Sequence, residues 1–135
     1  MERVRSFLSG LPPWLFSTLT IIAILWLTLA PKPLGEKPPP LFPGADKIAH
    51  GIMFGGLTAM LLLDWQRKHD WKPTINSRIW IDALSCGMFG ILIEYLQDFL
   101  QMGRGFEYAD MIADCAGALI IGLFWTCCQR SWTRR

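Results

Sequence analysis

The feature that most constrains this chain is the segment of residues 6–31, which contains no charged side chain. About 20 mostly apolar residues in helical form are enough to cross the hydrocarbon core of a bilayer. The whole chain has the same character, because 52% of its residues are hydrophobic and only 18% are charged, against about 25% charged in ordinary soluble domains. The sequence therefore predicts one integral membrane domain over residues 1–135.

A cleaved signal peptide is the alternative interpretation of the N-terminal segment. Arg3 and Arg5 precede the apolar run, and residues 28–30 loosely resemble a small-residue cleavage site. Two features oppose cleavage: the run is longer than the roughly 7 to 15 apolar residues of a signal peptide, and Pro31 would follow the cleaved bond. We therefore expect a first membrane span at about residues 14–30.

Three further spans are expected, at about residues 47–66, 79–102 and 108–128. A proline-rich outer loop at 31–43 separates the first two spans, because proline lacks the amide donor that a helix interior needs. The last two spans are less apolar, but their acids lie near the segment ends and leave long uncharged interiors. The expected fold is an all-α bundle of four transmembrane helices.

The orientation of the bundle follows from the distribution of lysine and arginine, which concentrate in cytoplasmic loops. In a four-helix arrangement one side carries nine basic residues, Arg3, Arg5, Arg67, Lys68, Lys72, Arg78, Arg130, Arg134 and Arg135. The other side carries four, Lys32, Lys37, Lys47 and Arg104. This difference predicts that both termini are cytoplasmic.

The charge and cysteine content exclude other classes of protein. The formal net charge is only +2, and the basic residues fall in loops and tails and not along one helix face, so no nucleic-acid-binding surface is indicated. The cysteines lack the spacing and the histidines of a zinc site. We expect all four to be small core residues: Cys86, Cys115, Cys127 and Cys128.

The second span also carries a packing signal. Gly51, Gly55 and Ala59 recur at every fourth residue, and small residues at this spacing let helix backbones approach closely in a membrane. Leu61, in the same span, is expected to face lipid. The stripe therefore predicts one helix–helix contact on this side of the span.

Polar residues from three spans are expected to meet at the outer membrane level. Residues four apart, such as Asp46 and His50 or Asp110 and Asp114, share a helix face, and Glu94 is the deepest acid of the set. Ionisable groups inside a membrane are costly and usually functional. The candidate ligand-binding residues are Asp46, Lys47, His50, Glu94, Gln97, Arg104, Asp110 and Asp114. The alternative is that they are interfacial side chains and helix caps, Asp46 and Asp110 among them.

These residues also resemble the VanZ-like family of bacterial membrane proteins. The resemblance lies in Asp46-Lys47-x-x-His50, Glu94-x-x-Gln97, Arg104, and Asp110-x-x-x-Asp114-x-x-Gly117, and it covers about residues 46–122. The family usually has asparagine where this chain has Asp114. It is named for a protein associated with teicoplanin resistance, so the resemblance implies a multi-pass protein of the bacterial inner membrane with a role in the cell envelope, and no particular reaction.

Three functions are compatible with this pattern. The first is binding of an anionic headgroup from a membrane lipid or a lipid-linked cell-wall precursor; because acids outnumber bases on this face, a divalent cation such as Mg²⁺ or Ca²⁺ would have to bridge it. The second is an intramembrane enzyme acting on an envelope lipid, with His50 or Glu94 as general base. The third is a small proton- or ion-coupled transporter, which four helices could form as a homo-oligomer. We favour the first.

Overall fold

The computed structural model describes residues 2–30, 42–100 and 106–132 of the chain. All the regular secondary structure in these segments is helical. The five helices are α1 (Glu2–Ser9), α2 (Leu15–Leu29), α3 (Ala45–Lys68), α4 (Asn76–Phe99) and α5 (Tyr108–Trp132). The prediction of an all-α protein is therefore confirmed.

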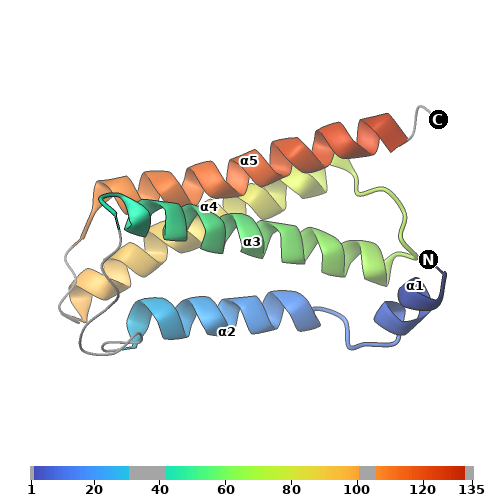
Figure 1. Cartoon of the computed structure of the whole chain (residues 1–135), viewed down its shortest axis with the longest axis horizontal. Helices are drawn as coiled ribbons and strands as arrows, with labels where there is room; N and C mark the ends of the chain where they lie inside the picture. Colours follow the sequence, from blue (N-terminus) through green and yellow to red (C-terminus); the bar gives the residue numbers. More distant parts are fainter. Residues whose placement is uncertain (1, 31–41, 101–105, 133–135) are drawn as a thin grey trace.

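The four long helices α2 to α5 lie alongside one another and alternate in direction (Figure 1). The contact of α3 with α5 is the most extensive, α4 packs on α5, and α2 lies mainly against α3. α1 and the end of α5 lie at one end of the bundle, called here the terminal end. The starts of α3 and α5 and the end of α4 lie at the opposite end, called the site end.

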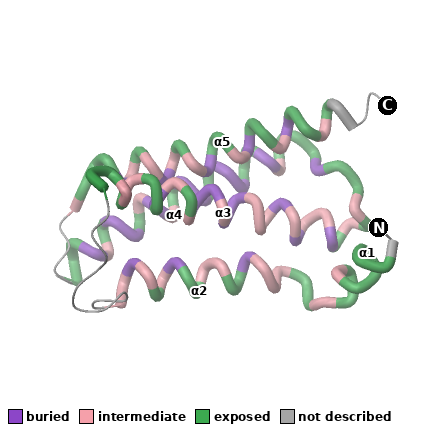
Figure 2. The backbone as a smooth tube through the Cα atoms, viewed as in Figure 1, coloured by how far each residue is buried: buried purple, intermediate pink, exposed green. Residues whose placement is uncertain are grey.

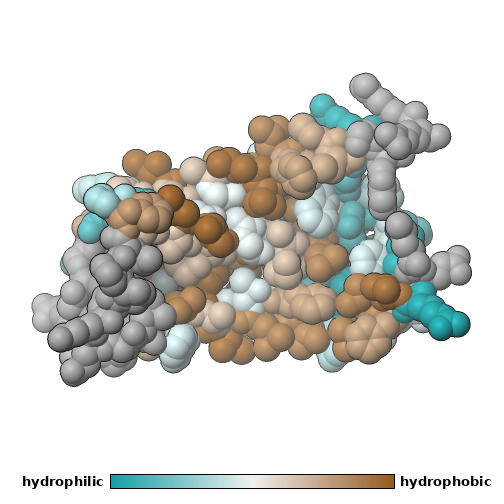
Figure 3. All heavy atoms as spheres, viewed as in Figure 1, coloured by the Kyte–Doolittle hydropathy of each residue, from teal (hydrophilic) through white to brown (hydrophobic). Residues whose placement is uncertain are grey.

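Three helices are long and apolar enough to cross a membrane, namely α3, α4 and the Tyr108–Arg130 part of α5. The helix α2 is more apolar than these three, but its 15 residues span only about 22 Å at 1.5 Å per residue, against a hydrocarbon core of about 30 Å. In Figure 3, hydrophobic residues cover the middle of the visible face and hydrophilic residues gather towards the terminal end. The structure thus has the helices of a membrane protein.

The helix boundaries differ from the predicted spans by a few residues at most. The second and fourth predicted spans correspond to α3 and α5, which extend further, and the third corresponds to α4, which begins and ends earlier. Hydropathy locates the apolar part of a helix and not its polar ends. The short helix α1 was not predicted, because it is polar and most of its described side chains are exposed. Most of the proline-rich loop 31–43 lies outside the described residues.

The core of the bundle is a cluster of buried apolar side chains from α2, α3, α4 and α5, namely Ile24, Phe54, Leu57, Cys86, Ile93 and Ala118. Buried positions line the inner sides of these helices in Figure 2. The expectation that every cysteine is a core residue is wrong for Cys127 and Cys128, which are exposed. The side of α5 that carries them faces away from the bundle, as expected of a helix that presents apolar residues to lipid.

Glycines set the distance between α3 and α5. A Cβ atom added at Gly55 would lie 3.1 Å from the carbonyl oxygen of Gly117, and one added at Gly117 would overlap the backbone of Gly51. The predicted stripe in α3 therefore does mark a close contact, and Gly117 of α5 is its partner. Leu61 was expected to face lipid, but it packs against the buried core.

A buried ion pair at the terminal end fixes how the chain enters the bundle. The Arg67 Nη1 atom lies 2.5 Å from Asp64 Oδ1, and the backbone amide and hydroxyl of Ser17 both donate to Asp64 Oδ2 at 2.8 Å. The Arg67 guanidinium also donates to the carbonyl oxygens of Leu8 and Leu11. Sequence reasoning placed Arg67 in a cytoplasmic loop, whereas here it is buried and joins α3 to the end of α1 and to the segment between α1 and α2.

Candidate functional site

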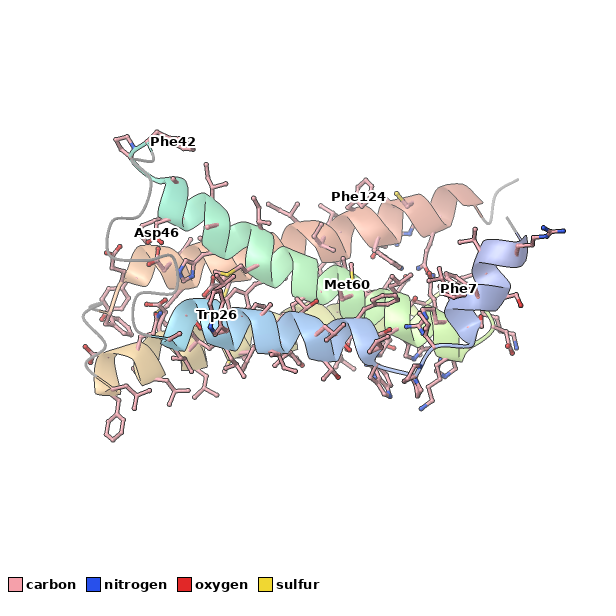
Figure 4. The ribbon with its side chains drawn as sticks, turned by 60° about the horizontal axis from the view of Figure 1, so that its bottom comes forward. Phe7, Trp26, Phe42, Asp46, Met60 and Phe124 are labelled. Atoms are coloured by element: carbon pink, nitrogen blue, oxygen red, sulfur yellow. The ribbon has the colours of Figure 1, made fainter. Side chains whose placement is uncertain are left out.

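The start of α3 places three of the candidate residues. Gly44 precedes the helix with a φ of 87°, a conformation that glycine adopts without strain. The first turn then presents Asp46 and Lys47, and His50 follows one turn after Asp46. His50 is buried and Asp46 is exposed, so α3 directs its histidine into the bundle. Figure 4 shows Asp46 at the same end as Phe42 and opposite Phe7 of α1.

The end of α4 contributes Glu94 and Gln97. Glu94 is only 1% exposed and Gln97 only 2%, while Asp98 is exposed. The side-chain amide of Gln97 donates to the carbonyl oxygen of Thr28 at 2.8 Å. Gln97 therefore joins α4 to α2, and its hydrogen bond is not directed at His50.

The first two turns of α5 supply Asp110 and Asp114, which share a face of the helix. His50 Nδ1 lies 2.9 Å from Asp114 Oδ1 and 3.9 Å from Glu94 Oε1. His50 Nε2 lies 3.9 Å from Asp110 Oδ2. In the part of the chain that the structure describes, every hydrogen bond and ion pair of the His50 ring is to a carboxylate.

Lys47 covers the outer side of this arrangement. Its ammonium lies 2.7 Å from Asp110 Oδ1 and 3.3 Å from Asp46 Oδ2, and it also pairs with Glu107. We call the five residues Lys47, His50, Glu94, Asp110 and Asp114 the His50 cluster. Its three carboxylates come from two helices and face one histidine and one lysine.

Most of the predicted site residues thus lie together at the site end. Asp46 lies at the exposed rim of the cluster, and Gln97 is one turn beyond Glu94 with a partner in α2. Arg104, which sequence reasoning also assigned to the site, lies outside the described residues. The burial of Glu94 and Asp114, which are 1% and 0% exposed, is difficult to explain by interfacial side chains alone.

Two residues near the cluster were not predicted as part of it. Glu107 pairs with Lys47, and its backbone amide donates to Glu94 Oε2 at 3.4 Å. Gly90 lies one turn before Glu94, and a Cβ atom there would come within 2.6 Å of Asp114 Oδ2. The spacing of four residues between Gly90 and Glu94 was a signal in the sequence, because it places a small residue directly below the deepest acid.

The fold and the cluster together define a helical membrane protein with a buried, predominantly acidic cluster of side chains at one end of its bundle. The family model described as VanZ/LLP1 matches residues 13–129. The chain therefore belongs to the VanZ-like family, as its motifs indicated. No curated protein and no solved structure shows a significant match to it.

Proposed function

We propose that this VanZ-like membrane protein binds the anionic headgroup of an envelope lipid or lipid-linked cell-wall precursor at the His50 cluster, through a bridging cation. The observation that carries the proposal is the burial of Glu94 and Asp114, for which His50 is the one basic partner within the described residues. Buried carboxylates are costly in a membrane bundle without compensating charge. A cluster that contains such carboxylates is better suited to binding a cation than to packing helices together.

The charge of the cluster decides how an anion could bind there. Lys47 is already paired with Asp46, Glu107 and Asp110, so it offers little uncompensated positive charge to a phosphate. A phosphate placed directly among the carboxylates would be repelled. A divalent cation held by the carboxylates removes this repulsion and leaves coordination positions for phosphate oxygens. The membrane location and the family resemblance support a ligand from the cell envelope.

A lipid-binding experiment tests this proposal. Purified protein in neutral detergent, with Mg²⁺ and Mn²⁺ present, is titrated calorimetrically with dihexanoyl phosphatidic acid or with a short polyprenyl phosphate. We expect saturable binding of a phosphate monoester, and the two probes distinguish a membrane phospholipid from a lipid carrier. Binding should weaken at least about tenfold in Glu94→Gln, because a charged ligand of the cation is lost.

Two controls accompany this titration. Dihexanoyl phosphatidylcholine carries no net charge and should not bind, and Asp98→Asn changes an exposed acid on the same helix and should bind like the unaltered protein. Equal binding of the charged and neutral lipids, or unaltered binding in Glu94→Gln, would overturn the proposal.

We also propose that α2 is a fourth, shorter span and that both termini are cytoplasmic in a bacterial inner membrane. In support, the elements at the terminal end carry most of the described basic residues, Arg3, Arg5, Arg67, Lys68, Lys72, Arg78 and Arg130, while Lys47 lies at the site end. Basic residues concentrate on the cytoplasmic side of bacterial membrane proteins. The His50 cluster would then lie at the outer side of the inner membrane. A protein with a role in teicoplanin resistance would also act on this side.

Reporter fusions test this orientation. Alkaline phosphatase, which is active only outside the cytoplasm, should be inactive when fused after Arg135 and active when inserted near Pro40. A fluorescent protein that folds in the cytoplasm should give the opposite pattern at the same two positions. Activity of the phosphatase after Arg135 would contradict the proposed orientation.

A further inference from the structure

The carboxylates around His50 fall into two groups that differ in which basic side chain neutralises their negative charge. Asp46 and Asp110 make up the outer group with His50, and the ammonium of Lys47 contacts both acids. Glu94 and Asp114 make up the inner group with His50, and in the described residues that histidine is their only basic partner. Among the described residues, the outer group therefore already has its cation in Lys47, and the inner group has no equivalent.

The inner group also has oxygens without partners. Glu94 Oε1 and Asp114 Oδ2 are buried and have no hydrogen-bond partner among the described residues. A buried polar atom left unpaired costs about 1–3 kcal/mol, and more when it is charged. Both oxygens belong to side chains that are nearly inaccessible. Their position beside the same histidine makes them available as donors to a ligand that accepts electron pairs from oxygen.

We propose that His50 Nδ1, Glu94 and Asp114 together bind one divalent transition-metal ion, either Mn²⁺ or Zn²⁺. This inference rests on the proposed function, since it names the cation that would join the headgroup to the protein. One donor atom from each of the three residues lies within 4.8 Å of the other two. An ion with bonds of about 2.1 Å holds adjacent donors roughly 3 to 3.5 Å apart, so small side-chain movements complete the site.

The imidazole determines which ion fits. Mg²⁺ and Ca²⁺ prefer oxygen donors throughout, whereas a nitrogen donor combined with carboxylates suits Mn²⁺, Fe²⁺ or Zn²⁺. The sequence alone suggested Mg²⁺ or Ca²⁺ from the number of acids; the burial of the His50 ring beside Glu94 and Asp114 adds a nitrogen donor to this set and changes that expectation. Two carboxylates also neutralise a divalent ion, which favours its burial.

The proton on the histidine has a defined destination. Metal binding would replace the hydrogen bond between His50 Nδ1 and Asp114 Oδ1; Nδ1 would then lack a proton and bind the metal, and the neutral imidazole would carry its proton on Nε2. His50 Nε2 faces Asp110 Oδ2 at 3.9 Å, and a carboxylate is a common hydrogen-bond partner for the second nitrogen of a metal-bound histidine. Asp110 would therefore be a positioning residue, held in turn by Lys47 at 2.7 Å.

Metal binding by the purified full chain tests the proposal without any lipid. The protein, freed of tags and of bound metal with a chelator, is titrated with Mn²⁺ and followed by electron paramagnetic resonance; Zn²⁺ is tested by competition. We expect one strongly bound Mn²⁺ per chain with magnetic coupling to an imidazole nitrogen, displaced by Zn²⁺. His50→Gln should abolish the nitrogen coupling, and Asp114→Asn should weaken binding at least tenfold.

Two further variants separate the inner group from the outer one. Gly90→Ala places a methyl group against Asp114 Oδ2 and should weaken Mn²⁺ binding although no donor is removed. Asp46→Asn changes an acid of the outer group and should leave Mn²⁺ binding unchanged. Thermal unfolding of each variant with chelator present shows whether it is folded, and only folded variants are compared.

The outcomes distinguish this inference from the function on which it rests. Absence of nitrogen coupling in the unaltered protein, or equal Mn²⁺ binding in Asp114→Asn, would overturn the metal site. If phosphate lipids bind with Mg²⁺ alone while neither Mn²⁺ nor Zn²⁺ is held, the inference fails and the proposed function survives. If Mn²⁺ binds as described and no phosphate lipid binds, the metal site stands and the headgroup function fails.

Discussion

Replacing Gly117 with alanine should prevent α3 and α5 from packing and lower the free energy of unfolding by about 3 kcal/mol or more, the upper end for overpacked sites. The added methyl group would overlap the carbonyl group of Gly51. That group belongs to a helix backbone and cannot rotate away as a side chain could. The whole of α3 would have to move, and the largest helix–helix contact in the bundle would be lost. Unfolding in mixed detergent micelles measures the change.

Gly56 provides a matched control for this substitution. It lies on the same helix as Gly55, yet among the described residues a Cβ atom there would have no neighbour within 4 Å. Gly56→Ala should therefore leave stability unchanged or raise it slightly, since alanine favours a helix over glycine by about 1 kcal/mol. Leu61 is unsuitable as a neutral control, because it contacts the core. Equal stability of Gly117→Ala and Gly56→Ala would refute the close contact.

Replacing Asp64 with alanine should have a comparably large effect, of about 3 to 5 kcal/mol. The substitution leaves the Arg67 guanidinium buried without a counter-charge, and it removes the acceptor for two hydrogen bonds from Ser17. The carbonyl oxygens that Arg67 also contacts can accept hydrogen bonds, but they carry no full negative charge. Thermal unfolding in detergent measures the loss.

Two companion variants isolate the role of the charge. Asp64→Asn keeps an acceptor for Ser17 but removes the charge opposite Arg67, and its stability should lie between those of Asp64→Ala and the unaltered protein. Asp98→Ala removes an exposed acid and should change the free energy of unfolding by less than about 0.5 kcal/mol. If Asp64→Ala were as stable as Asp98→Ala, the ion pair would contribute nothing to the fold.

The sequence predicted the helices and the site more completely than it predicted their connections. Uncharged segments and residues at helical spacing identify which parts of the chain span a membrane and which side chains share a face, so His50, Glu94 and Asp114 could be assigned to one site. These patterns do not show which oxygens stay unpaired, because that depends on the relative rotation of three helices. Arg67 was misplaced for a related reason, since composition does not distinguish a buried arginine from a loop arginine.

The two ends of α2 are held by different helices, and this has a mechanical consequence for the site. Ser17 is attached to Asp64 of α3, whereas the carbonyl oxygen of Thr28 accepts its hydrogen bond from Gln97 of α4. Gln97 lies one turn from Glu94, so a rotation of α4 that turned Glu94 away from His50 would also withdraw the donor from Thr28. The helix α2 thereby opposes a rotation of α4 that would reorient Glu94.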